Sequence, residues 1–270
     1  MSFIDRLYNA IDKKNSLLCI GLDPVRQQLP SLFQLKEQPL FEFSKYIIDL
    51  TQEYAVAYKP NSAFFEAWGS SGIQQLQQTC DYIKERFPDT LVILDAKRGD
   101  IGSSNAGYIG YAFDYLHADA ITLHPYLGKE SFDDFLNMKD IGVIIQCRNT
   151  NPGAIEIQGL PVQYSNTVMP LYQVIAHKAA HEWNVNNNVL LVVGATNPQD
   201  VGIIREITGD MTFLVPGVGA QGGELEATVK AGLNSQKRGL IISAGRSIIY
   251  AQNPVAEAMK LRDAINSFRT

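Results

Sequence analysis

Cysteine is scarce and long apolar runs are missing, and each absence excludes a class of protein. Cys19, Cys80 and Cys147 are the only cysteines in 270 residues, and an odd, scattered set does not make a disulfide framework. We therefore expect buried, reduced thiols in a cytoplasmic protein. No apolar run approaches the roughly 18 residues of a membrane helix, so we expect no membrane partner. Residues 1–14 look like a short amphipathic helix and lack the apolar stretch of a signal peptide.

Clustered positive charge is also missing. The formal net charge is −5, and no stretch is rich in lysine or arginine. Proteins that bind nucleic acid are usually basic, at least locally, so the sequence predicts no nucleic-acid partner. The motifs of several hydrolase classes are absent, because the chain has neither GxSxG nor HExxH. With 46% hydrophobic residues the chain can still bury a sizeable core, as a globular enzyme or binding protein does.

Eight apolar, strand-like runs are present, and helix-like stretches separate them. The runs cover residues 17–24, 56–64, 91–100, 120–126, 142–150, 189–197, 213–221 and 240–247. Eight strands alternating with helices predict an α/β fold, a (β/α)8 TIM barrel, with a short N-terminal helix before it. At this length we expect one barrel domain over residues 1–270. A doubly wound open sheet is the alternative.

The connection after the fifth run differs from the others. Residues 149–164, NTNPGAIEIQGLPVQY, are long for a strand-to-helix connection and are a candidate lid. Residues 165–183, SNTVMPLYQVIAHKAAHEW, are predicted to form the helix that follows. His177 and His181 share one face of that helix, far from any strand end. We interpret them as a surface or interface feature, and we predict no metal site.

The third run carries the densest set of charges. Residues 91–94 are four apolar residues in a row, which is typical of a strand buried on both faces. Asp95, Lys97 and Asp100 follow at once, and alternation along a strand should point Asp95 and Lys97 the same way. An ammonium buried beside a carboxylate costs desolvation free energy, which favours a functional role. The structural alternative is a strand-end salt bridge beside a solvated loop.

Polar residues follow most of the other runs as well. Active sites of these barrels are built at the carboxyl ends of the strands, so these residues are candidates for the site. They are Asp23, Lys59, Asn61, His124, Arg148, Asn149, Thr150, Asn197, Gln221 and Arg246. In a barrel that binds no ligand, we would expect polar residues at one or two strand ends, but not at nearly all of them. We interpret His124 as a wall of the pocket.

The last two runs end in small residues. PGVGAQGG (216–223) and SAGRS (243–247) each precede a helix-like stretch, and Arg246 lies in the second. Free backbone N–H groups at a helix start, with an arginine nearby, bind phosphate. The loops after strands seven and eight are the usual phosphate site of such barrels. The sequence therefore predicts a phosphorylated substrate.

These motifs together resemble the orotidine 5′-phosphate decarboxylase family, most closely its longer bacterial branch. The resemblance covers essentially the whole chain, through GLDP, YKPNSAFFE, DAKRGDIG, RNTNPGA, PGVGAQGG and SAGRS. The DxKxxD element at a third-strand exit is the most specific of them. The resemblance implies decarboxylation of orotidine 5′-monophosphate to UMP in pyrimidine biosynthesis, with no metal and no cofactor.

The resemblance also implies roles for individual residues. The charged tetrad of the family matches Lys59, Asp95, Lys97 and Asp100. In the family the last aspartate enters the site of the neighbouring subunit, which implies a homodimer with shared active sites. Ile101 and Ser104 would accompany Asp100. The expected substrate contacts are Asp23 for the ribose, Gln221, Gly245 and Arg246 for the phosphate, and Asn149, Thr150 or Asn151 for the pyrimidine.

The implied chemistry suits these residue types. Losing CO2 from C6 leaves a carbanion without a conventional electron sink, so electrostatics and positioning must stabilise it. The Lys97 ammonium would stabilise the charge and then protonate C6. The flanking carboxylates of Asp95 and Asp100 should keep that lysine charged.

Three other functions use the same residues differently. Magnesium-dependent sugar-phosphate lyases and decarboxylases of the same superfamily share DxKxxD, but they hold the metal with a glutamate at the second strand end. This chain has Lys59 there, and a cation would repel the metal. A Schiff-base aldolase would need a depressed pKa at Lys97, against two neighbouring carboxylates. A non-catalytic nucleotide sensor would not require four charges in the site.

Overall fold

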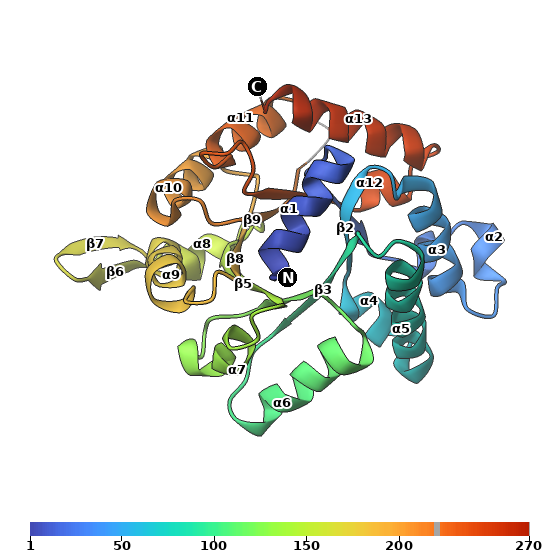
Figure 1. Cartoon of the computed structure of the whole chain (residues 1–270), viewed down its shortest axis with the longest axis horizontal. Helices are drawn as coiled ribbons and strands as arrows, with labels where there is room; N and C mark the ends of the chain where they lie inside the picture. Colours follow the sequence, from blue (N-terminus) through green and yellow to red (C-terminus); the bar gives the residue numbers. More distant parts are fainter. Residues whose placement is uncertain (219–221, 270) are drawn as a thin grey trace.

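The structure is a computed structural model that describes residues 1–218 and 222–269, and its eight parallel strands close into a barrel (Figure 1). The strands are β1 (Leu18–Leu22), β2 (Ala55–Pro60), β3 (Leu91–Arg98), β4 (Ala120–Leu123), β5 (Gly142–Arg148), β8 (Val189–Val193), β9 (Phe213–Pro216) and β10 (Leu240–Ala244). Each lies within a predicted run or begins one residue before it. Strand β1 pairs with both β2 and β10, which confirms the barrel and rules out the open sheet.

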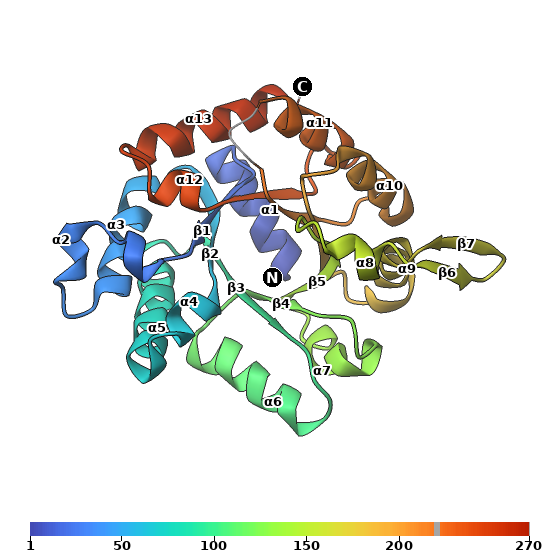
Figure 2. The ribbon, with the colours of Figure 1, turned by 180° about the vertical axis from the view of Figure 1, so that it is seen from behind.

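Helices surround the barrel (Figures 1 and 2). The longer ones are α3 (Pro39–Thr51), α5 (Gly69–Arg86), α6 (Ser103–Ile109), α9 (Leu171–Lys178), α10 (Pro198–Thr208), α11 (Gly222–Gly232) and α13 (Pro254–Ser267). The short ones are α2 (Ser31–Gln34), α4 (Ser62–Glu66), α7 (Asp133–Leu136), α8 (Ala154–Gln158) and α12 (Arg246–Ile249). Single π-helical segments extend α6 over Gly110–Tyr115 and α9 over Ala179–Trp183.

The predicted N-terminal helix is confirmed as α1 (Phe3–Lys14), and it lies across the amino end of the barrel. Ser2 begins it with a capping box, in which Ser2 and Asp5 satisfy each other's backbone N–H groups. Phe3 is fully buried, and its ring packs against the start of β5 so closely that a Cβ on Gly142 would lie 2.8 Å from it. Since α1 covers this end, the polar residues at the carboxyl ends of the strands lie on the other side of the barrel from it.

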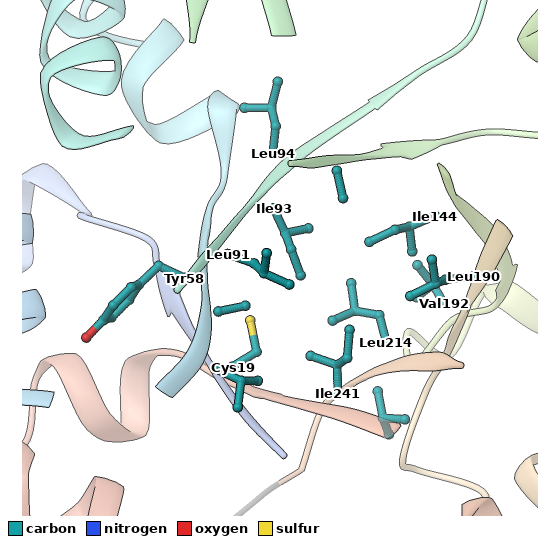
Figure 3. Close-up of a cluster of buried hydrophobic side chains, with 14 of the residues drawn as sticks. Cys19, Tyr58, Leu91, Ile93, Leu94, Ile144, Leu190, Val192, Leu214 and Ile241 are labelled. Carbon is teal, nitrogen blue, oxygen red and sulfur yellow. The ribbon is translucent and has the colours of Figure 1, made fainter. Parts of the chain in front are cut away.

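The barrel interior is filled by side chains that alternate along the strands. Leu91 and Ile93 of β3 point inward, together with Ile144 and Val192 from other strands (Figure 3). Tyr58 points outward, where its hydroxyl hydrogen-bonds with Thr51 of α3. The inward series on β3 therefore leads to position 95. The three cysteines are buried free thiols. None of the helices described is both long and apolar enough to cross a membrane.

One predicted element is wrong in part. Residues 165–183 do not form a single helix, because β6 (Pro161–Tyr164) and β7 (Thr167–Pro170) make an antiparallel hairpin that projects from the barrel beside α9 (Figure 2). Ser165 adopts a left-handed φ of 53° at the turn. Pro170 has no N–H to donate, so the helix begins after it. The candidate lid 149–164 likewise contains α8 and β6 and is not a bare loop.

Candidate active site

The charged pair predicted from β3 lies at the carboxyl end of the barrel. Lys97 Nζ is 2.5 Å from Asp95 Oδ1, so the two side chains do point the same way. The backbone between them, however, is not a regular strand. Strand β3 pairs with β4 at Leu94 and again at Arg98, with a bulge between, and Lys97 has a left-handed φ of 49°. Such conformations are uncommon for residues with a side chain and are often found at functional sites.

A second lysine completes an ion triplet around Asp95. Lys59, at the end of β2, places Nζ 2.6 Å from Asp95 Oδ2, so each carboxylate oxygen faces one ammonium. The side chains of Lys59 and Asp95 are only 8% and 11% exposed, whereas that of Lys97 is 41% exposed. Lys97 is therefore the charge of the triplet that a ligand can reach most freely.

The two buried members of the triplet, Asp95 and Lys59, stabilise each other's charged forms. Burial opposes the charged form of Asp95, but the ammonium groups of Lys59 and Lys97 outweigh it and hold the pKa of that carboxyl well below its ordinary value. Burial likewise opposes the charged form of Lys59, yet the carboxylates of Asp95 and Asp23 raise the pKa of Lys59 above its ordinary value. Both groups are therefore ionised across the physiological range.

The triplet borders a cavity of about 230 Å³. Its lining residues are Lys59, Asp95, Lys97, Thr122, Gln146, Asn149, Thr150, Asn151, Val192, Leu214 and Pro216. Sequence reasoning did not single out Thr122 or Gln146. Both are polar residues inside otherwise apolar strands, β4 and β5, and that pattern could have indicated them.

The segment after β5 brings three predicted residues to the cavity. Asn149 Oδ1 is buried and accepts no hydrogen bond from the described residues, so it is available to a donor on a ligand. The Asn149 backbone N–H is held at 2.9 Å by Gln158 Oε1 of α8. Thr150 packs its methyl so closely on Gly194 that a Cβ there would lie 2.4 Å away. These contacts fix the segment against α8 and the end of β8.

The predicted ribose and phosphate residues lie where β1 and β10 end side by side. Asp23 Oδ1 is buried without a partner among the described residues, and burial raises the pKa of that carboxyl. A Cβ on Gly245 would lie 3.3 Å from Asp23 Oδ2, so a side chain there would crowd the carboxylate. Arg246 is exposed at the start of α12. Gln221 lies outside the described residues.

The three residues predicted after β3 are not brought to this cavity, whose lining also lacks Asp23, Gly245 and Arg246. Asp100 accepts a hydrogen bond from the Ile101 N–H at 2.8 Å, and within the described chain no ion pair joins it to a lysine or arginine. Ile101, in the connection between β3 and α6, is 57% exposed, and Ser104 in the first turn of α6 is also exposed. A single chain therefore does not complete the predicted tetrad.

Two other strand-end residues take structural positions. Arg148 turns away from the cavity and donates from Nε to Asp200 of α10 at 2.8 Å. Asp200 also accepts from the Tyr172 hydroxyl at 3.0 Å, so this network ties β5 to the helix layer. His124, predicted as a wall of the pocket, does not line the cavity. Burial and the nearby Lys97 ammonium lower the pKa of His124.

The histidine pair lies away from this site, as predicted. The rings of His177 and His181 are 4.5 Å apart on α9 and its extension, and His177 packs against Tyr164 of the hairpin. Among the described residues no group of three histidine, cysteine or acidic side chains is arranged to hold a metal ion.

The family match, the relatives and the solved structure that this chain resembles agree with one another. Residues 16–261 match the model of the orotidine 5′-phosphate decarboxylase / HUMPS family. Proteins named orotidine 5′-phosphate decarboxylase from Cellvibrio japonicus and Dechloromonas aromatica are 48% and 43% identical, over all of this chain and all of theirs. The solved OMP decarboxylase of Leishmania donovani superposes with a TM-score of 0.88 at 37% identity, over 100% of this chain and 99% of that one.

Proposed function

This chain belongs to the orotidine 5′-phosphate decarboxylase family, and on that premise we propose how its site converts orotidine 5′-monophosphate to UMP and CO2. The observation that carries the proposal is the ion triplet at the rim of the closed barrel. It holds one carboxylate between two ammonium groups and leaves Lys97 open to the cavity. This arrangement suits a reaction in which negative charge develops on one carbon and a proton must be delivered there.

Lys97 is the proton donor in this proposal. The bond from C6 to the carboxylate breaks, its electron pair stays on C6, and CO2 leaves. The Lys97 ammonium stabilises that charge and then transfers a proton from Nζ to C6, which gives UMP. Asp95 pairs with the Lys97 ammonium and orients it through a 2.5 Å contact. Lys59, deeper in the site, anchors the opposite oxygen of Asp95.

The remaining residues hold the substrate in place. We propose Asn149 as the residue that reads the pyrimidine, because its unpartnered Oδ1 suits the ring N–H donor. The Asp23 carboxylate would accept hydrogen bonds from ribose hydroxyls. Gly245, Arg246 and Gln221 would bind the phosphate, whose contacts far from C6 supply binding energy for orientation.

Three broader properties belong to the same proposal. We propose that residues 1–270 act as one domain, since all eight barrel strands share one closed sheet. The exposure of Ile101 and Ser104, beside an Asp100 that makes no ion pair among the described residues, supports a homodimer in which the three residues complete the partner's site. Buried free thiols support a cytoplasmic location.

The activity itself is tested by the loss of orotidine 5′-monophosphate absorbance with purified protein, with and without excess EDTA. We expect turnover that EDTA does not change, because Lys59 already occupies the Asp95 oxygen that a metal would bind. Turnover that stops with EDTA and returns with Mg²⁺ would show that the site uses a metal at Asp95. No turnover by folded protein would favour the sugar-phosphate branch of the superfamily. Binding of UMP without turnover by folded protein would favour a sensor.

Replacing Arg246 with alanine is expected to weaken UMP binding by about 10- to 100-fold, the usual cost of losing a hydrogen bond to a charged group. Isothermal titration with UMP and with uridine measures this. Uridine lacks the phosphate, so its affinity should not change. Arg262→Ala is the matched control, since that arginine lies on α13 and pairs with its neighbour Asp263. An unchanged UMP affinity in Arg246→Ala would remove the phosphate assignment.

A further inference from the structure

The hydroxyl of Thr122 lies where the bulge of β3, the Asp95 carboxylate and the Lys97 backbone meet. Its Oγ1 accepts hydrogen bonds from the backbone N–H groups of Ala96, at 3.1 Å, and Lys97, at 2.9 Å. It is also 3.1 Å from Asp95 Oδ1. A hydroxyl has a single proton, and both amides are donors, so that proton must be directed at the carboxylate. One side chain therefore orients both the backbone and the partner of Lys97.

These bonds replace the sheet pairing that the bulge removes. Leu94 pairs with Ile121 and Arg98 pairs with Leu123, so Thr122 alone stands opposite residues 95–97. Buried backbone N–H groups need acceptors, and here the ladder does not supply them. Pairing resumes where the His124 N–H donates to the Arg98 carbonyl at 2.8 Å. Thr122 thus bridges the gap in the sheet.

The bulge also contains an uncommon backbone conformation. Lys97 has a left-handed φ of 49°, which a residue with a side chain adopts only when its surroundings hold it there. Thr122 itself is fully buried at the edge of the cavity, on β4. A fixed hydroxyl on a rigid strand is well suited to hold a strained residue on the neighbouring strand.

We propose that Thr122 is a positioning residue for catalysis: its hydroxyl holds the β3 bulge so that the Lys97 ammonium faces the substrate. This inference rests on the proposed role of Lys97 as the proton donor. Thr122 acts through Lys97 and Asp95. Losing the hydroxyl should therefore slow the chemical step while leaving substrate affinity nearly unchanged.

The test compares valine and serine at position 122. Thr122→Val keeps the shape of the side chain and removes the hydroxyl. We expect kcat to fall about 100-fold, because a small misplacement of a catalytic group has an effect of that size. KM and UMP affinity should stay within about threefold of the wild-type values. Thr122→Ser keeps the hydroxyl and should retain kcat within about threefold. Thr79→Val is the matched control, since Thr79 is equally buried but bonds only within α5, and it should match the wild type.

A second measurement does not depend on turnover. Amide hydrogen exchange, followed by NMR, should show faster exchange at Ala96 and Lys97 in Thr122→Val, with serine like the wild type. Thr122→Cys, whose thiol is a weak acceptor, takes the place of valine if that variant does not fold. Wild-type kcat in Thr122→Val, or unchanged exchange at both amides, overturns the proposal. Absence of turnover in the wild type overturns the proposed function instead, and the exchange data still decide whether Thr122 holds the bulge.

Discussion

Replacing Lys97 with alanine is expected to lower kcat by about 10⁴-fold or more, because one change removes both the proton donor and the cation nearest the developing charge. Lys97 is the most exposed charge of the triplet, and its Nζ lies 2.5 Å from Asp95. UMP affinity should change far less, since the phosphate and ribose contacts come from other strand ends. Single-turnover kinetics measure the chemical step, and titration with UMP measures binding.

The Lys97→Ala protein should remain folded. Asp95 keeps its 2.6 Å contact with Lys59 and the hydrogen bond from Thr122, so the buried carboxylate is not left without partners. Lys230→Ala is the matched control, because that ammonium is paired with Glu226 on the surface of α11. Thermal unfolding of both variants should match the wild type within a few degrees. A folded Lys97→Ala protein with substantial turnover would contradict the role of Lys97 as the proton donor.

A heterodimer of Lys97→Ala and Asp100→Ala chains is expected to recover about half of the wild-type activity, although each variant alone is inactive. In the single chain Asp100 bonds its own backbone neighbour and makes no ion pair among the described residues. If Asp100 serves the partner's site, one site of the heterodimer receives both substitutions and the other receives none. Two affinity tags, one on each chain, allow the heterodimer to be purified and assayed.

A second heterodimer serves as the control. Lys59 and Lys97 both contact Asp95 within one chain, so a dimer of Lys59→Ala and Lys97→Ala chains has one defect in each site. It should stay inactive. Recovery in the first pair but not in the second locates Asp100 in the partner's site. A purified Lys97→Ala and Asp100→Ala heterodimer as inactive as its parents would show that the sites are not shared in this way.

Sequence patterns anticipated the barrel well because its signals are local. Each barrel strand is a short apolar run that ends in polar residues, and parallel strands bring those ends to one edge. The same rule predicts that Lys59, Asp95 and Lys97 lie at one rim, where their ion pairs are found. The rule predicts His124 as a wall of the pocket, which it does not line, and it assigns no role to Arg148. The reason is that a position at a strand end does not determine whether the side chain turns toward the cavity or toward the helices. Arg148 turns to Asp200, which is distant in sequence.

Local signals also failed to predict the β6–β7 hairpin. Residues 165–170 are predicted as the start of a helix, but residues 167–170 form β7, which pairs with β6. The helix begins at Leu171, directly after the hairpin. The Leu171 N–H bonds the Leu160 carbonyl at 2.9 Å, across the base of the hairpin. Pairing partners of this kind are set by the turn and by tertiary packing, and composition alone did not reveal them.

The sequence by itself determined where the eight barrel strands lie along the chain and the chemical types of the residues at the rim, because apolar periodicity and strand-end polarity are properties of short segments. The closure of the sheet depends on the pairing of β1 with β10, which the sequence left open. Only the tertiary structure decided how β3 is held against β4. The register skips from Leu94 to Arg98, and the Thr122 hydroxyl bonds the amides left in the gap. Those contacts join residues that are about 25 positions apart, and inter-strand register depends on packing across the whole barrel.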